Sequence, residues 1–345
     1  MIRNLRIVLV VGVVAGVTTL GGCKKEAAPP PAKPGEGKGP TAAGPLQGVA
    51  VGFVQVGAES SWRTAETKSI QDEAARRGCD LKFADGQGKQ ANQIKALRSF
   101  VNQKVDVIVL APIVETGWDE VLGRAKKAGI PVILVDRGVK VADESLYTTK
   151  IASDFVFEGR LAGEWLAKKL SGKGSIAELR GTEGAAPAID RKKGFEEAIA
   201  KHPDLKIVLT ETGKFERAEG KKVMKTFLDS GTKIDAVYAH NVDMALGAIQ
   251  AIEEKGLKPG KDILLIGIDT VRGAFEAMKQ GKLNATVECS PYLGPLTFDM
   301  VEKVLAGQEV PRYVQVKDRL FEPPAAESVL ANWPPPAVAM ETEAP

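Results

Sequence analysis

The chain alternates between two kinds of apolar pattern. Short continuous apolar runs, such as 105–112, are typical of strands buried on both faces of a parallel sheet. Between them, apolar residues recur three and four positions apart, which predicts amphipathic helices. In the first half, the pattern predicts strands at 51–56, 80–84, 105–112 and 132–135, with helices ending at Gly78 and covering 90–103 and 118–128.

The same alternation restarts in the second half. It predicts strands at 175–179, 206–210, 234–239 and 263–268, and helices at 155–170, 191–201, 216–230, 243–255 and 273–280. Segment 105–112 is similar to 234–241, and segment 129–136 is similar to 262–269. Alternating strands and helices form parallel sheets. The sequence therefore predicts an α/β fold of two similar doubly wound parallel-sheet lobes.

Three predicted crossings between the lobes, near 147–153, 288–291 and 313–316, divide the chain. The N-terminal lobe is expected to comprise 47–151 plus 290–316, and the C-terminal lobe 152–289 plus 317–332. Several crossings form a multi-strand hinge of the kind that closes around a ligand. The Pro-rich and acidic segment 333–345 is expected to be a disordered tail.

The N-terminus has the form of a secretory signal. Arg3 and Arg6 precede an apolar run that is too short for an ordinary membrane-spanning helix. The run ends in Leu20-Gly21-Gly22-Cys23, which resembles a bacterial lipobox. We therefore expect a lipoprotein signal peptide at 1–22 and a lipidated Cys23 that anchors the protein to a bacterial membrane. The alternatives are an uncleaved anchor and a plain signal with a chance cysteine.

Segment 23–46 is rich in Pro, Ala, Gly and Lys and has no apolar periodicity, so it predicts a flexible tether.

Composition excludes several functions. The 47 basic and 44 acidic residues give a net charge of +3, which is too balanced to indicate nucleic-acid binding. Three cysteines and two histidines support neither a disulfide framework nor a His-based metal site. The chain lacks the P-loop, C-x-x-C, H-E-x-x-H and G-x-S-x-G motifs. We expect no cofactor, no metal and no catalytic residue, and we interpret His240, Cys79 and Cys289 as packing residues.

Polar residues recur where predicted strands end. The candidates for ligand binding are Glu59, Ser60, Ser61, Trp62, Arg63, Asp136, Arg137, Arg191, Asn241 and Asp269. In open α/β sheets, ligands lie at the carboxyl ends of strands. An indole offers a flat face to the C–H groups of a sugar ring, and arginine donates two parallel hydrogen bonds to adjacent hydroxyls. The alternative is that Trp62 is core and the polar residues are helix caps or surface ion pairs.

The motifs carrying these residues resemble those of the periplasmic sugar-binding proteins of the ribose-binding type, which feed ABC transporters. They are Val135-Asp136-Arg137 and the segments 188–195, 239–244 and 266–269, within a match that covers about 48–322. Segments 52–63, 84–87, 92–96 and 238–241 are most similar to the galactofuranose-binding members of that family.

The resemblance implies a type I periplasmic binding protein fold and a set of contacts. Glu59 to Arg63 would line one wall, with Trp62 stacked on the sugar. Asp136 and Arg137 would bind hydroxyls from the first lobe, and Arg191, Asn241 and Asp269 from the second. Phe215 lies where the family often has a second aromatic, whereas a family glutamine has no counterpart at Glu288-Cys289.

The expected function is that of a lipid-anchored, monomeric periplasmic protein, not an enzyme. It would bind an aldose, galactofuranose by resemblance, between its lobes and deliver it to an ABC transporter permease. A sugar-sensing subunit that feeds a membrane receptor or kinase is the alternative. A repressor of the same fold would need an N-terminal helix-turn-helix, where a signal sequence stands instead.

Overall fold

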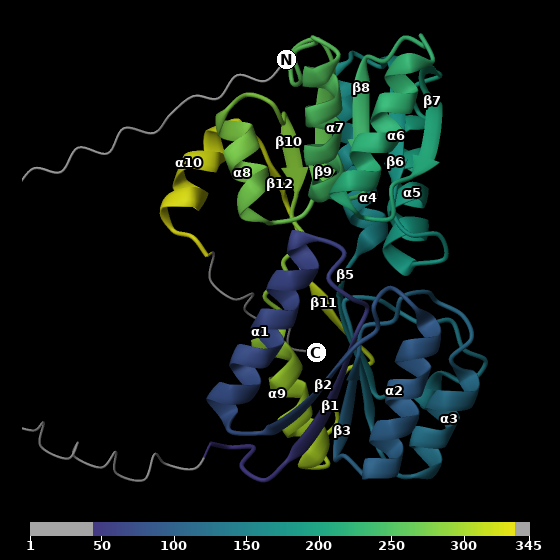
Figure 1. Ribbon diagram of the computed structural model, residues 1–345, viewed down its shortest axis with the longest axis vertical. Coiled ribbons are helices and arrows are strands. Elements are labelled where there is room, and N and C mark those ends of the chain that lie inside the picture. Colours follow the sequence, from purple (N-terminus) through teal and green to yellow (C-terminus); the bar gives the residue numbers. More distant parts are fainter. Residues whose placement is uncertain (1–43, 335–345) are drawn as a thin grey trace, which may run out of the picture. The chain divides into compact units, whose positions relative to one another are not determined.

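The computed structural model describes residues 44–334. The predicted signal peptide, Cys23, nearly all of the predicted tether and residues 335–345 lie outside this range. The described part has two α/β lobes, each built on a six-stranded sheet (Figure 1).

The first lobe contains the sheet ordered β11-β5-β4-β3-β1-β2, in which all neighbouring strands are parallel. Its strands are β1 (Ala50–Gln55), β2 (Asp80–Asp85), β3 (Val107–Leu110), β4 (Val132–Val135), β5 (Thr149–Ser153) and β11 (Tyr313–Val316). Its helices are α1 (Ser61–Arg77), α2 (Gln90–Gln103), α3 (Asp119–Lys127), the short 3₁₀ helix η1 (Glu144–Leu146) and α9 (Gly294–Leu305). Helices α1 and α9 pack together on one side of the sheet, and α2 and α3 on the other (Figure 1).

The second lobe contains the sheet ordered β12-β10-β9-β8-β6-β7. Its strands are β6 (Lys173–Arg180), β7 (Asp204–Thr212), β8 (Ala236–Ala239), β9 (Leu264–Ile268), β10 (Ala285–Val287) and β12 (Leu320–Phe321). Its helices are α4 (Phe155–Lys169), α5 (Ala186–Ile199), α6 (Arg217–Asp229), α7 (Val242–Glu254), α8 (Arg272–Lys279) and α10 (Pro323–Ala331). Only its edge strand β12 is antiparallel to its neighbour.

The two sheets have equivalent strand orders. In each sheet, the first strand of the lobe (β1 or β6) lies next to the following strand in the sequence (β2 or β7), which forms one edge of the sheet. Strands β3, β4 and β8 are buried at every position, which explains their continuous apolar runs. The predicted fold of two doubly wound lobes is confirmed.

The chain passes between the lobes after β5, after β10 and between β11 and β12. Leu46 and Trp333, near the two ends of the described range, contact the lobes. Leu46 is buried, and its amide donates to the carbonyl of Arg77 over 3.1 Å. The ring of Trp333 lies 6.1 Å from that of Phe275 and 6.5 Å from that of Tyr292.

Three local predictions differ from the structure. The helix expected to begin at Arg191 begins at Ala186, because Pro187 suits the first helical turn rather than a loop. Helix α10 was not predicted, although prolines in its first turn are compatible with a helix start. Strands β10 and β12 were missed because runs of three and two residues carry no detectable periodicity.

Close packing of α4 against α5 requires glycine. A Cβ atom on Gly194 would lie 1.9 Å from the carbonyl oxygen of Val156. We expect Gly194→Ala to lower the free energy of unfolding by about 1–3 kcal/mol, since overpacking of this kind forces the backbone apart. Thermal and urea unfolding measure the change.

Gly123 in α3 is the matched control. The nearest atom that its Cβ would meet lies 4.0 Å away, so Gly123→Ala should be neutral or stabilise the helix by roughly 1 kcal/mol. Equal destabilisation by both substitutions would show that helix packing does not set the cost.

Candidate functional site

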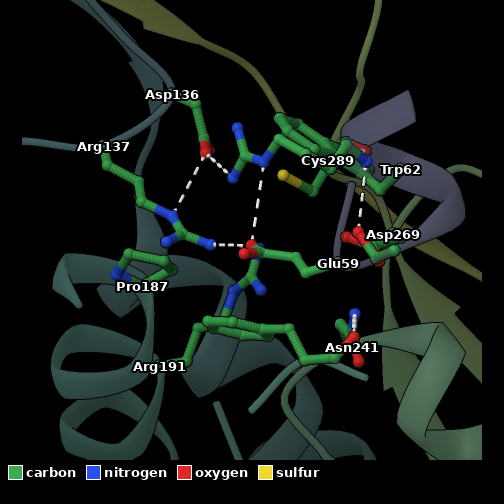
Figure 2. A pocket seen from close by; sticks show the side chains of 12 residues that line it. Glu59, Trp62, Asp136, Arg137, Pro187, Arg191, Asn241, Asp269 and Cys289 are labelled. Atoms are coloured by element: carbon green, nitrogen blue, oxygen red, sulfur yellow. Dashed lines mark hydrogen bonds and ion pairs between the residues drawn. The ribbon is translucent and has the colours of Figure 1, made fainter. Parts of the chain in front are cut away.

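A small cavity lies between the lobes at the carboxyl ends of their strands (Figure 2). It is lined by Glu59, Ser60, Trp62, Arg63, Asp136, Arg137, Pro187, Arg191, Phe215, Asn241, Asp269 and Cys289. All of the predicted ligand-binding residues except Ser61 are brought together here.

Local structure places the first-lobe residues. The hydroxyl of Ser60 caps α1 by accepting a hydrogen bond of 3.1 Å from the amide of Arg63, which sets Trp62 and Arg63 in the first helical turn. Asp136 follows β4 with a left-handed φ of 62°, and its amide donates to the carbonyl of Ile151 over 2.8 Å. Aspartate tolerates this conformation better than most residues.

Arg63 connects helix α1 to the end of β4 in the first lobe. Its Nη1 lies 2.5 Å from Glu66 Oε2, and its Nη2 lies 2.5 Å from Asp136 Oδ2. Burial opposes the charge of Arg63, but Asp136, Glu66 and Glu59 outweigh this effect and raise the pKa of the guanidinium. Arg63 is therefore a permanent buried cation.

Arg137 lies beside this network. Its Nη2 is 2.5 Å from Glu59 Oε1, and its Nη1 donates to the carbonyl of Ile113 over 3.3 Å. Figure 2 shows Arg137, Asp136 and Glu59 meeting on one side of the cavity. Burial lowers the pKa of Arg137 despite the nearby Glu59, so this guanidinium is poorly compensated for its loss of water.

Arg191 is the buried cation of the second lobe. Its Nε donates to Glu158 Oε2 over 2.7 Å, and its Nη1 donates to the carbonyl of His240 over 2.6 Å. The His240 ring is held in turn by Glu178, whose Oε1 is 3.2 Å from Nε2. His240 is thus a buried structural residue that positions a carbonyl.

Asn241 and Asp269 follow β8 and β9. Asn241 caps α7, accepting a hydrogen bond of 3.0 Å from the amide of Met244, and its Nδ2 donates to the carbonyl of Phe215. Asp269 has a φ of 141°, a conformation that L-residues rarely adopt. Burial raises the pKa of Asp269 well above its usual range, although Arg191 acts in the opposite direction.

Three buried polar atoms of the cavity-lining residues lack a hydrogen-bond partner within the described chain: Nε of Arg63, Nε of Arg137 and Oδ2 of Asp269. The two Nε atoms lie only at ion-pair distance from a carboxylate, 3.7 Å from Glu59 Oε1 and 3.5 Å from Asp136 Oδ2. Two are donors from the first lobe, and one is an acceptor from the second. Leaving such groups unpaired costs about 1–3 kcal/mol each. A hydroxyl group both donates and accepts, so a molecule with several hydroxyls suits this set.

Aromatic rings supply the apolar part of the cavity. The Trp62 indole is held by a 2.8 Å hydrogen bond from Nε1 to the carbonyl of Cys289. Phe215 adopts a left-handed φ of 65°, and the Arg137 guanidinium lies 5.1 Å from the centre of its ring. A Cβ atom at Gly181 would lie 1.9 Å from the Phe215 ring, so only glycine leaves room for this aromatic.

The sequence and the structure differ at three site positions. Ser61 does not line the cavity; its amide and hydroxyl contact Asp243 instead. Cys289, interpreted only as a packing residue, is buried and also lines the cavity. Pro187 was not predicted as a site residue. A helix predicted to begin at Ala186 would have placed Pro187 and Arg191 four residues apart on one helix face, and Pro187 would then have been a candidate.

The comparisons with known proteins identify the family of this chain. Residues 51–309 match the family model described as the periplasmic binding protein domain. The chain belongs to the periplasmic binding protein family. The family resemblance inferred from the sequence motifs is therefore confirmed.

Three relatives are similar over most of the chain. The galactofuranose-binding protein YtfQ of Escherichia coli (strain K12) is 51% identical over 285 residues, which are 81% of this chain and 90% of the relative. The periplasmic binding protein component of the arabinose ABC transporter from Shewanella sp. ANA-3, bound to α- and β-L-arabinofuranose, is 52% identical. It has a TM-score of 0.80 and covers 82% of this chain and 95% of its own.

A protein from Mycobacterium smegmatis in complex with β-D-fucofuranose is 50% identical, with a TM-score of 0.81. The match covers 82% of this chain and 94% of that one. The relatives are binding proteins, and this periplasmic binding protein is not an enzyme.

Residues 44–334 contain no group of three His, Cys, Asp or Glu side chains placed to hold a metal ion. No helix within the same range has the length and apolar character needed to cross a bilayer.

The buried carboxylate of Asp269, whose Oδ2 has no hydrogen-bond partner within the described chain, should make the sugar-free protein less stable. We expect Asp269→Asn to raise the free energy of unfolding at pH 7 by about 1–3 kcal/mol, because asparagine carries no charge to desolvate. The folded pKa lies above the unfolded value of about 3.9, so the cost is absent below about pH 4 and grows as the pH rises. Thermal unfolding at pH 4 and pH 8 tests this dependence.

Asp204→Asn, at an exposed position, is the control and should leave stability unchanged at both pH values. An Asp269→Asn variant whose stability relative to wild type were the same at pH 4 and pH 8 would contradict the assignment.

Proposed function

We propose that this protein binds an aldose in its furanose form, galactofuranose or a close analogue, in the cavity between its two lobes. The observation that carries the proposal is the convergence of unpaired polar atoms from both lobes beside two aromatic rings. Apolar ring faces and a polar rim are the two features of a sugar, and the cavity offers a partner for each.

The relatives support the furanose form. The three similar proteins bind, by their names, galactofuranose, arabinofuranose and fucofuranose. These sugars share a five-membered ring and differ in their substituents.

Within the cavity, each candidate residue has a proposed role. Trp62 and Phe215 would contact the C–H faces of the ring, and Arg63 and Arg137 would donate to hydroxyls through Nε. Asp269 would accept from a hydroxyl on the opposite side. Asp136, Arg191 and Asn241 complete the polar rim, together with Glu59 and Ser60.

Binding to both lobes would drive closure of the hinge. A ligand shifts a conformational equilibrium only by its differential affinity for the two states. A sugar can contact Arg137 and Asp269 at once only when the lobes are together. The sugar would therefore bind more tightly to the closed state than to the open state, and binding would shift the equilibrium toward closure. The closed protein, acting as a monomer, would present the sugar to the permease of an ABC transporter.

The N-terminal prediction completes the proposal. Lipid on Cys23 would hold the protein at a bacterial membrane, and the segment 24–43 would let the lobes reach a permease in the same compartment. The predicted tether is shorter than expected at its C-terminal end, because Leu46 packs against the first lobe. Residues 23–43 lie outside the described part of the chain, so the sequence motif alone supports this part of the proposal.

Calorimetry with a panel of sugars tests the binding proposal. Galactofuranose and arabinofuranose should bind to the wild type, and their pyranose forms should bind more weakly. Arg137→Ala should weaken binding about tenfold or more, a loss of about 1.4 kcal/mol, because it removes a desolvated donor. Arg137→Lys should rescue binding only in part, since an ammonium group cannot reproduce the planar donor set.

The exposed Arg272 provides the control, and Arg272→Ala should bind like the wild type. Failure of all furanoses to bind would reject the function. Unchanged affinity of folded Arg137→Ala would show that the sugar lies elsewhere.

Lipidation of Cys23 has its own test. We expect the mature wild-type protein to begin at a diacylated Cys23 and to sediment with membranes, because only the thiol at the lipobox is modified. Cys23→Ser should be released or remain unprocessed, as seen by mass spectrometry and fractionation. Cys79→Ser, a change at a partly buried cysteine in the folded region, should stay at the membrane. A soluble wild-type protein with an unmodified cysteine would refute the anchor.

A further inference from the structure

Ser61, which was expected to bind the ligand, makes a different contact. It is the first residue of α1 in the first lobe, and its amide and hydroxyl both point to the carboxylate of Asp243 in α7 of the second lobe. The amide nitrogen lies 2.7 Å and the hydroxyl oxygen 2.6 Å from the same oxygen, Oδ2. The two residues are 182 positions apart in the sequence.

A residue of its own lobe, Arg217, orients Asp243 for this contact. Its other oxygen, Oδ1, accepts hydrogen bonds from Arg217 Nε at 3.0 Å and Nη2 at 2.6 Å. The residue is only 4% exposed. Since Arg217 and Asp243 belong to the same lobe, this ion pair persists when the lobes separate, and the carboxylate keeps its orientation.

The contact is charge-assisted through its acceptor, the carboxylate of Asp243. A carboxylate that accepts from neutral donors forms shorter and stronger hydrogen bonds than a neutral acceptor does. The amides in the first turn of a helix have no partner within the helix, and the N-terminus of α1 favours a negative charge. Asp243 therefore accepts a hydrogen bond from an N-terminal amide of a helix that belongs to the opposite lobe.

Neither residue lines the sugar cavity, although both are close to it along the chain. Ser60 and Trp62 on either side of Ser61 do line it, and so does Asn241, two residues before Asp243. The contact thus lies beside the cavity wall and connects the lobes without occupying the space for a ligand.

We propose that Ser61 and Asp243 form a latch between the lobes, which exists only in the closed protein and slows the release of bound sugar. The latch rests on the proposed sugar-binding function. Opening the hinge breaks both hydrogen bonds at once, so the closed state gains stability that the open state lacks. Because no latch atom has to touch the sugar, the effect falls on dissociation rather than on the choice of ligand.

A double-mutant cycle tests the latch, with dissociation of galactofuranose measured by stopped-flow tryptophan fluorescence. Asp243→Asn should accelerate dissociation about tenfold, and Ser61→Ala, which keeps the amide donor, by a smaller factor. The double variant should be no faster than Asp243→Asn alone. Loss of the Arg217 ion pair occurs whether residue 61 is serine or alanine, so the coupling in the cycle reports only the inter-lobe contact.

The association rate and the ranking of sugars should change little in these variants. The loss of thermal stability that follows from losing the Arg217 ion pair in Asp243→Asn should be the same with serine or alanine at position 61. Such a pattern distinguishes a latch from a general structural defect. Additive effects in the cycle, or wild-type dissociation in folded Asp243→Asn, would overturn the latch. Absence of sugar binding by the wild type would instead reject the proposed function.

Ser61→Pro is a second variant that does not depend on the folding of Asp243→Asn. Proline suits the first position of a helix, and Ser60 before it is already extended, as a residue preceding proline prefers. The substitution removes both donors and places a ring carbon where the amide hydrogen pointed. Small-angle scattering at saturating galactofuranose should show a larger radius of gyration than for wild type, and equal radii would count against the latch.

Discussion

The buried guanidinium of Arg63 sets the geometry of the first lobe, because a cation without water must be surrounded by acceptors. Glu66 and Asp136 supply them, and Glu66 also accepts a 3.0 Å hydrogen bond from Gln55 at the end of β1. Strand β1, helix α1 and the end of β4 are joined through this one charge. Removal of any partner would leave a buried ion uncompensated, which is costly.

The second lobe solves the same problem with different residues. Arg191 is neutralised by Glu158 and hydrogen-bonded by the carbonyl of His240. In each lobe, the buried cation is held from behind by its own lobe and borders the cavity. Two similar folds thus contribute different polar groups to one site, and that asymmetry suits a ligand whose two sides differ.

Strained backbone gathers at the same place. Asp136, Phe215 and Asp269 all have positive φ and all line the cavity. Such conformations persist only where the surrounding structure enforces them, and they are common at functional sites. Arg63, Arg137 and Asp269 also have buried atoms without a hydrogen-bond partner at the cavity. Both features lower the stability of the folded protein at the cavity, and packing elsewhere in the two lobes compensates for this cost. A ligand that satisfies these atoms recovers part of it.

The sequence alone determined the two-lobed parallel architecture and most of the residues around the cavity. Continuous apolar runs require sheets buried on both faces, and polar residues after those runs must collect at the carboxyl edge. Edge strands such as β12 escaped prediction because two residues carry no period. The start of helix α5 was predicted at Arg191 instead of Ala186, because local sequence signals do not determine the exact residue at which a helix begins.

Only the tertiary structure decided what each polar side chain contacts. Ser61 and Trp62 are neighbours in the sequence, yet one bonds to Asp243 across the lobes and the other borders the cavity. Cys289 reaches the cavity because the crossing after β10 passes it. These outcomes depend on how two distant halves of the chain meet, and no periodic pattern within either half encodes the distance between them.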